Sequence, residues 1–421
     1  MKILGIKCSG HDTGASLLYE QSGKIELSAI SEARLNRSKH SYKYPLLSIK
    51  YVLDRFNIKS LDEVDLICID KHGENWLEKD SQFSRFFAKN LSKHDYDLDM
   101  KFNYLIEQSI KFPKEKVFYV NHIDAHAASA YYVSGFSESA VLTIEGGLGF
   151  YIGEGNNLKI IDRTGYNGDE YKDGKIISRS GSSIHRSNIS NLYDLITSKL
   201  GLDKFAAGKT MALAAFRHTV KEENYLNIPK NRHYGFQTDY SELISSLSAT
   251  VKNFKSSSSD KKDTEILQEY WVNIAREAQT ALEEDVLYFA RLAYEKSGSK
   301  NLALTGGVAL SCVTNRKILD LKLFENVFVQ PASSDEGIPL GCALWGYHQI
   351  KKGEARSKMT NAYLGTPNQT QDLIPILDKY KLNYKKSNSS EVAKFYPKEK
   401  LSEEYLADPS TDLEHSEIEV S

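Results

Sequence analysis

Two histidines four residues apart lie in a segment of otherwise small and aromatic residues, VNHIDAHAASAYYVSGF, which spans positions 120–136. On a helix, His122 and His126 would lie on the same face, one turn apart. Two such imidazoles and a carboxylate from elsewhere are a common ligand set for zinc or iron. The spacing therefore suggests half of a metal site, although a partly exposed helix can also carry two unrelated polar residues.

Asp335, in the segment PASSDEG, is the carboxylate that we expect to complete this site. The segment should join a strand to a helix, and functional side chains often lie in such loops. A metal held there with an open position would polarise a substrate oxygen. The alternative for Asp335 is a helix N-cap, a position that Asp favours.

His11 and Asp12 lie in SGHDTGA, which is expected to be the turn between the first two strands. A histidine with a neighbouring carboxylate can act as a general base near neutral pH. The alternative is a turn in which Asp12 only hydrogen-bonds to local backbone. We predict these two as catalytic residues.

Glycine pairs follow two predicted strands, in IEGGLG (144–149) and in LTGGVAL (304–310). Such turns expose backbone N–H groups to phosphate, and a nucleotide clamp needs one from each side. Ordinary turn glycines would look the same. The predicted nucleotide-binding residues are Glu145, Gly146, Gly147, Gly306, Gly307 and Asn315.

Basic residues that could bind an anionic substrate occur in SEARLNRSKHS and in AAGKTMALAAF. The first contains Lys39 and His40, and the second contains Lys209. The second lacks the earlier glycine of a Walker A motif, so we exclude that motif. We predict Lys39, His40 and Lys209 as substrate-binding residues, against the alternative of solvated loops.

The predicted strands and helices follow a similar order twice along the chain, which indicates a duplicated α/β fold. We predict an actin-like pair of ribonuclease-H-type lobes, at residues 1–138 and 139–350, with nucleotide in the cleft between them. Residues 351–421 have few long apolar patterns, and their acidic end is expected to be disordered.

Charge and hydropathy narrow the function classes. The formal net charge is -2, from 54 basic and 56 acidic side chains, which gives no general attraction to nucleic acid or to anionic membrane. No apolar run approaches the roughly 18 residues that span a bilayer. We therefore predict a cytoplasmic protein.

Six motifs, in this order, resemble the O-carbamoyltransferases of the NodU/CmcH type: GHDTGASLL, SEARLNRSKH, NHIDAHAASAYY, GKTMALAAF, TGGVAL and VFVQPASSDEGIPLG. The resemblance covers about residues 1–366. It implies the actin-like fold and a kinship with the tRNA threonylcarbamoyl transferases.

The resemblance also implies an activity. A C-terminal domain would make carbamoyl-adenylate from carbamoyl phosphate and ATP, and the N-terminal domain would pass the carbamoyl group to the hydroxyl of a sugar or secondary metabolite. A divalent metal, iron or zinc, would be held by His122, His126 and Asp335. His11 would be the catalytic histidine near the acceptor hydroxyl.

The chain departs from the family pattern at several places. The acidic glycine turn ends in Phe150 where the family has an acid, and Ala207 and Ala212 replace Glu and Gly. Residues 351–421 resemble only the opening of the adenylating domain. We therefore expect a remnant of that domain here, with adenylate supplied by a partner protein.

Two other functions remain open at this point. A degenerate relative would bind nucleotide without turnover. A tRNA-modifying threonylcarbamoyl transferase relative is the second, although the near-neutral charge makes nucleic acid an unfavoured partner.

Overall fold

The computed structural model describes residues 1–8, 10–71, 112–164, 170–178, 188–203, 205–216, 225–250 and 269–366, with 375, 377–381, 384–387 and 417–420. Chain contacts divide it into two units, Met1–Leu364 and Gly365–Ser421. In the second unit, β13 (Tyr384–Ser387) pairs in antiparallel fashion with β14 (Glu417–Val420). The predicted division at 138 and 350 stays a prediction.

The first sheet has the strand order β3-β2-β1-β4-β5. Its strands are β1 (Lys2–Lys7), β2 (Gly14–Gln21), β3 (Lys24–Ser31), β4 (Leu66–Lys71) and β5 (Val117–Asn121). The first three are antiparallel, and β1, β4 and β5 are parallel. A two-residue turn, with Ser22 and Gly23 both at positive φ, joins β2 to β3 as in a tight hairpin.

The second sheet has the same strand order in its core, β8-β7-β6-β11-β12, and is extended by β9 and β10 next to β8. Again the first three strands are antiparallel and the last two are parallel to β6. Two sheets of the same order and sense confirm the predicted actin-like duplication. The strands are β6 (Glu138–Ile144), β7 (Leu148–Glu154), β8 (Asn157–Thr164), β9 (Glu170–Lys172), β10 (Lys175–Ser178), β11 (Asn301–Thr305) and β12 (Asn326–Val329).

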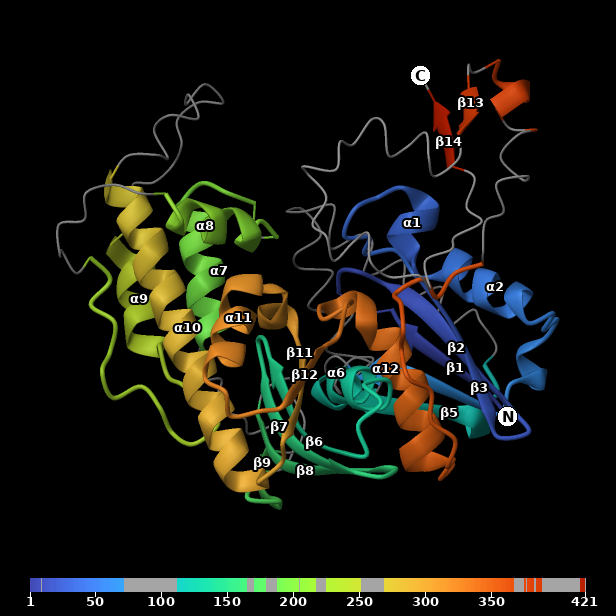
Figure 1. Ribbon diagram of the computed structural model, residues 1–421, viewed down its shortest axis with the longest axis horizontal. Helices are drawn as coiled ribbons and strands as arrows, with labels where there is room; N and C mark the ends of the chain where they lie inside the picture. The colour runs from blue at the N-terminus through green and yellow to red at the C-terminus, as the bar shows by residue number, and fades with distance from the viewer. Residues whose placement is uncertain are drawn as a thin grey trace, which may run out of the picture. The chain divides into compact units, whose positions relative to one another are not determined.

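Two short, almost wholly buried helices lie between the sheets: α6 (His122–Tyr131) and α12 (Ile338–Trp345) (Figure 1). Small residues allow their backbones to touch. A Cβ added at Gly341 in α12 would lie 1.8 Å from the carbonyl oxygen of Ala125 in α6. The side chain of Asn121 caps α6 by accepting the backbone N–H of Ile123, so the helix begins at His122.

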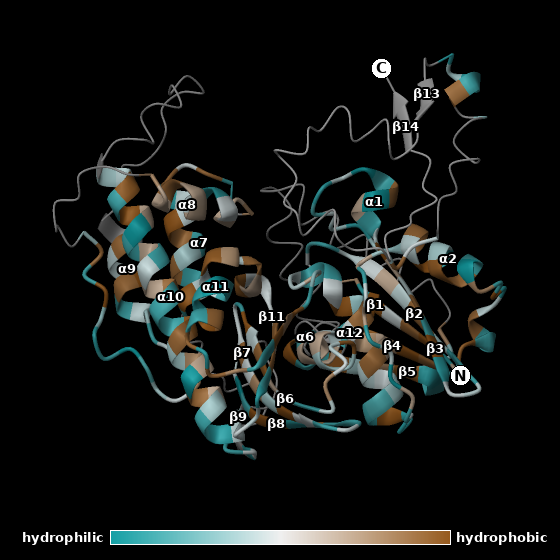
Figure 2. Ribbon diagram, in the orientation of Figure 1, coloured by the Kyte–Doolittle hydropathy of each residue, from teal (hydrophilic) through white to brown (hydrophobic). Residues whose placement is uncertain are grey.

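The remaining helices cover the outer faces of the sheets. Beside the first sheet are α1 (Glu32–Asn36) and α2 (Leu46–Arg55). The second sheet is covered by a helical layer around the 29-residue α10. This helix carries both hydrophobic and hydrophilic residues along its length (Figure 2), and its hydrophobic residues pack into the core. This layer contains α7 (Ile189–Lys199), α8 (Ala207–Ala214), α9 (Ser241–Thr250), α10 (Glu269–Ser297) and α11 (Cys312–Asp320). Among the helices described, none is both long and apolar enough to cross a membrane.

Replacing Gly341 by Ala should destabilise the protein, because the new methyl group would overlap the backbone of α6. Overpacking of this kind costs about 1–3 kcal/mol or more. Urea unfolding measures the loss. The control is Gly208→Ala in α8, where a methyl group meets no atom within 4 Å and should be neutral or stabilising by up to about 1 kcal/mol. Equal stability of the two variants would contradict the close contact of α6 and α12.

His348 should make the stability pH-dependent. It is 2% exposed, in the π-helical turn Gly346–Ile350, and stacks on Tyr132. Burial lowers its pKa from 6.5 to about 4. The unfolded chain therefore binds the extra proton between these values, and stability falls as the pH drops below 6.5. Urea unfolding should show that, between pH 7.5 and 5.5, the wild type loses ~1 kcal/mol more stability than His348→Gln; equal changes in the two proteins would refute this.

Candidate metal centre and adjoining pocket

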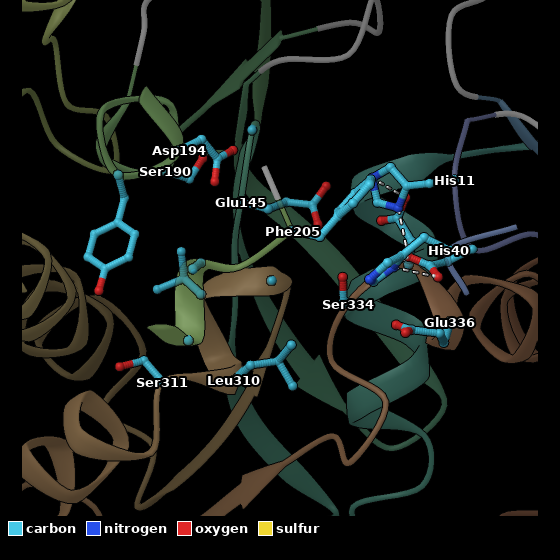
Figure 3. A pocket seen from close by; sticks show the side chains of 18 of the residues that line it. His11, His40, Glu145, Ser190, Asp194, Phe205, Leu310, Ser311, Ser334 and Glu336 are labelled. Atoms are coloured by element: carbon cyan, nitrogen blue, oxygen red, sulfur yellow. Dashed lines mark hydrogen bonds and ion pairs between the residues drawn. The ribbon is translucent and has the colours of Figure 1, made fainter. Parts of the chain in front are cut away.

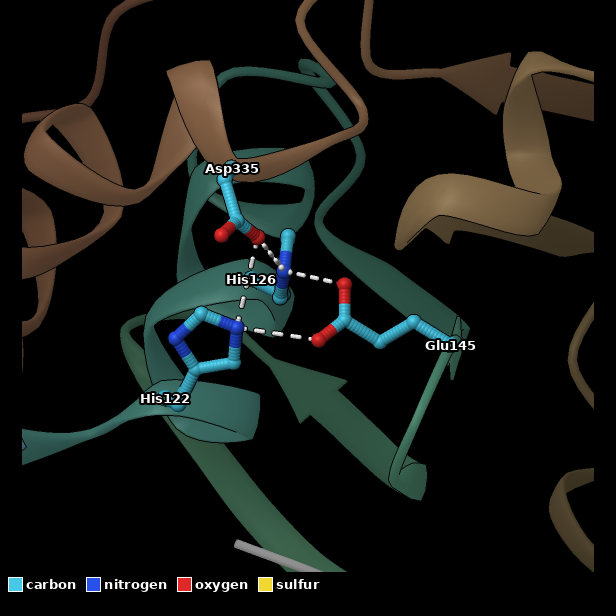
Figure 4. Close-up of side chains that lie close together, drawn as sticks. All are labelled: His122, His126, Glu145 and Asp335. Carbon is cyan, nitrogen blue, oxygen red and sulfur yellow. Dashed lines mark hydrogen bonds and ion pairs between the residues drawn. The ribbon is translucent and has the colours of Figure 1, made fainter. Parts of the chain in front are cut away.

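Four side chains from three separate parts of the chain lie close together just beyond the ends of β5 and β6 and before α12: His122, His126, Glu145 and Asp335 (Figure 4). Their potential ligand atoms all lie within 4.8 Å of one another, and all four residues are buried. The two histidines come from α6, Glu145 follows β6, and Asp335 lies in the 3-10 turn Asp335–Gly337 just before α12.

Glu145 faces both imidazoles. Its Oε1 lies 2.9 Å from Nε2 of His122, and its Oε2 lies 2.7 Å from Nε2 of His126. Asp335 approaches the same nitrogens with Oδ1, at 3.4 Å from His122 and 3.6 Å from His126. Neither ring nitrogen of His126 has a hydrogen bond of good geometry to a described residue. Nε2 of His126 and Oε2 of Glu145 are therefore close to each other without forming an aligned hydrogen bond.

Asp70, near the end of β4, orients the ring of His122. Both of its carboxylate oxygens lie 3.2 Å from Nδ1 of His122. With a proton held on Nδ1, the lone pair of Nε2 would be available to a metal bound between His122, Glu145 and Asp335. A carboxylate behind a histidine in this way is typical of metal sites, where it sets the tautomer and raises ligand basicity.

The donor set fits a divalent metal. Two imidazole nitrogens and two carboxylates at one buried point need a positive charge between them. Burial alone would raise the pKa of Glu145, but His126 and His122 outweigh it and hold that pKa well below its usual value. Burial would lower the pKa of each imidazole, but carboxylates, above all Asp70 and Glu145 at His122 and Glu145 at His126, raise it. Protons can therefore occupy the rings, and a metal would displace them.

His11 and His40 share one carboxylate next to this cluster. Nδ1 of His11 lies 2.7 Å from Oδ2 of Asp12, and Nδ1 of His40 lies 3.1 Å from both oxygens of Asp12. Burial would raise the pKa of Asp12, but the hydrogen bonds from the two rings outweigh it and lower that pKa. Nε2 of His11 lies 3.7 Å from Oδ2 of Asp335, so the predicted base adjoins the predicted metal ligand.

A pocket of about 550 Å³ opens onto both groups. Figure 3 shows His11, His40 and Phe205 at one side of it, Ser190 and Asp194 at the other, and Glu145 between them. The ring of His40 stacks on that of Phe205 at 4.1 Å. Among the described residues that line the pocket, none is Lys or Arg. Within this described lining, backbone N–H groups, hydroxyl groups, histidines and a metal are the groups that could meet an anionic ligand.

The predicted nucleotide-binding residues separate into two groups. Glu145, Gly146 and Gly307 line the pocket, whereas Gly147, Gly306 and Asn315 do not. Gly306, at φ 88°, packs against backbone, because an added Cβ would lie 2.5 Å from the carbonyl oxygen of Ile144. The side-chain amide of Asn315 donates to the carbonyl oxygen of Ala309 at 2.7 Å. The structure thus gives the second group local structural contacts.

The predicted substrate-binding residues also separate. His40 lines the pocket, but Lys39 and Lys209 are exposed and do not line it. Sequence reasoning assigned Glu145 to nucleotide and missed Lys7, Asp70, Asp194 and Glu336. Partial desolvation at the pocket wall raises the pKa of Asp194 to about 6 and also raises the pKa of Glu336, although both residues are exposed. The signal for Asp70 was its position at the end of a buried strand.

The chain belongs to the carbamoyltransferase family, because the family model for the carbamoyltransferase N-terminus matches residues 2–344. Nodulation protein NolNO of Sinorhizobium fredii is 29% identical over 369 residues, which are 84% of this chain and 49% of that protein. An uncharacterised protein of Synechocystis, sll1178, is 28% identical over 392 residues, which are 86% of this chain and 60% of that protein. The chain thus spans between about half and three fifths of these relatives.

Full-length HypF, in its phosphate- and nucleotide-bound form, is one of the solved structures with a similar fold. It aligns with 85% of this chain and 56% of its own, at 12% identity and a TM-score of 0.41.

Replacing Glu145 by Gln should weaken metal binding about 100-fold or more, because it removes a charged ligand and even residues that only support a ligand contribute about 10- to 100-fold. Replacing His126 by Ala should abolish it. Isothermal titration with Zn²⁺ measures both, and the wild type should release protons on binding, so affinity should rise with pH.

The control for this prediction is Glu336→Gln, which removes a carboxylate from the same pocket wall but not from the cluster. Its zinc affinity should stay within a few-fold of wild type. Equal losses in the Glu145 and Glu336 variants would show that general negative charge, and not the four-residue cluster, attracts the metal.

Proposed function

We propose that this chain catalyses metal-assisted transfer of a carbamoyl group to the hydroxyl of a sugar or secondary metabolite. The observation that carries the proposal is the pairing of two sites on one pocket. One is a buried cluster suited to a divalent metal, iron or zinc, and the other is a histidine base whose Nε2 lies 3.7 Å from the cluster's Asp335.

In the proposed reaction, the acceptor hydroxyl oxygen attacks the carbamoyl carbon and the bond from that carbon to the phosphate oxygen of the donor breaks. The hydroxyl proton passes to Nε2 of His11. Asp12 holds the other nitrogen of that ring at 2.7 Å, which fixes the tautomer and stabilises the charge that develops. The leaving group carries away the electron pair of the broken bond.

The cluster residues would supply the second element of the reaction. His122, His126, Glu145 and Asp335 would hold the metal, which when bound supplies polarisation of the carbamoyl oxygen. Because no lysine or arginine lines the described pocket wall, the same charge also helps to offset the phosphate of the donor. The donor is proposed to be carbamoyl-adenylate, made from carbamoyl phosphate and ATP in another domain or by a partner protein.

The test supplies pre-formed carbamoyl-adenylate, so that it does not depend on where the adenylate is made. With Fe²⁺ or Zn²⁺ present, the wild-type chain should release AMP, and should carbamoylate members of a panel of amino and neutral sugars, detected by mass spectrometry. His11→Ala should slow transfer about 10²- to 10⁴-fold, the usual contribution of a general base.

The control is His233→Gln. This residue also contacts a carboxylate, Asp285, at 2.9 Å, but it lies outside the pocket and its loss should leave the rate unchanged. Tight binding of the adenylate without AMP release would refute the proposal and indicate a non-catalytic nucleotide-binding relative. Carbamoylation independent of His11 would refute the assigned base.

A further inference from the structure

The Lys7 side chain is fully buried, at the end of β1 and directly behind the metal cluster. Its Nζ donates to the backbone carbonyl oxygen of His11 at 2.7 Å. The same atom lies 3.2 Å from Oδ2 of Asp335. A buried ammonium group is costly unless paired and hydrogen-bonded, so these contacts determine where Lys7 can be. One cation thus joins the backbone of the predicted base to a predicted metal ligand.

The two oxygens of Asp335 face different partners. Oδ1 faces the imidazoles of His122 and His126, at 3.4 and 3.6 Å. Oδ2 faces Nζ of Lys7 at 3.2 Å and Nε2 of His11 at 3.7 Å. Because the ammonium group holds Oδ2, only Oδ1 is directed to the point where the ligand atoms converge.

We infer that Lys7 is a positioning residue that restricts Asp335 to one metal-binding oxygen and ties the His11 turn to the metal centre. The inference rests on the proposed metal function of the cluster. Binding through a single oxygen would keep the cluster at four ligand atoms, so that a five- or six-coordinate ion would retain a position for the substrate. The hydrogen bond to the His11 carbonyl would keep the base at a set distance from that position.

Electrostatic balance agrees with this role. Burial would lower the pKa of Lys7, but Asp335 and Asp70 outweigh it and the pKa is raised, so the group is charged at neutral pH. Lys7 in turn is the largest influence that opposes burial at Asp335 and lowers the pKa of that carboxyl group.

The experiment loads wild type and Lys7→Met with Co²⁺ and records the visible absorption, whose intensity falls as the coordination number rises. If Lys7 occupies Oδ2, its loss frees that oxygen and the cobalt bands of Lys7→Met should weaken and shift. Carbamoyl transfer should fall about 10- to 100-fold, the range for residues that support metal ligands. Lys7→Arg, which keeps a charged donor, should restore both in part.

The control is Arg232→Met. It removes another buried cation, 6% exposed and 2.7 Å from the fully buried Asp285, far along the chain from the cluster. Its stability loss should be comparable, but its cobalt spectrum should match wild type. Melting curves of all variants show whether each is folded. If Lys7→Met does not fold, a crystal structure of the zinc-loaded wild-type chain still shows how many oxygens Asp335 contributes, and two would refute the inference.

An unchanged cobalt spectrum in folded Lys7→Met, with metal bound more tightly, would refute the positioning role. It would show that Lys7 affects the metal only through charge repulsion. Failure of the proposed function gives a different result: wild type would bind no Co²⁺, or His122→Ala would bind it equally well. A spectral change in Lys7→Met without any carbamoyl transfer in wild type would support the inference and count against the proposed reaction alone.

Discussion

The structure is organised around the burial of two carboxylates against two imidazoles at one point between the sheets. Ionised groups leave water only when partners of opposite charge are held in place, and here each partner comes from a different part of the fold. His122 and His126 depend on α6, Glu145 depends on the end of β6, and Asp335 depends on the turn before α12. The chemistry is thus inseparable from the packing of the two lobes.

Backbone contact between α6 and α12 makes this arrangement possible. Side chains larger than hydrogen at Gly341 would push α12 away from Ala125, and with it the turn that carries Asp335. Gly306 acts in the same way on the other side, because its close approach to Ile144 fixes the strand end that precedes Glu145. Two glycines therefore set distances among side chains that neither of them touches.

The succession of strands and helices along the chain and part of the site could be predicted from the sequence because their signals are local. The repeated order of strands and helices, the turn at SGHDTGA and the four-residue spacing of His122 and His126 each depend on neighbours in the chain. Asp335 could be added through its place in a strand-to-helix loop. The structure brings these three side chains together, and their role as ligands stays a prediction.

The rest depended on contacts between distant residues. Glu145 lies in a glycine-rich turn that suggested phosphate binding, and only the pairing of β6 with β11 and the position of α6 direct it at the imidazoles. Lys7 occurs in a plain apolar strand, where a lysine normally indicates a solvent-exposed face. Its 0% exposure follows from Asp335, which is more than 300 residues away in the chain. Lys39 and Lys209 show the reverse, since a motif places them near the pocket but neither lines it.

The duplicated topology explains why such distant residues meet. In each sheet the parallel strands end at the same edge, and ligands of open α/β sheets bind beyond the carboxyl ends of their strands. Lys7, Asp70 and His122 lie at or just after the ends of β1, β4 and β5, and Glu145 follows the end of β6 in the other sheet. Two such edges facing one pocket bring imidazoles and carboxylates from both sheets to one point. Buried Lys7 then links the β1–β2 turn, which carries the predicted base His11, to the adjoining predicted metal ligand Asp335.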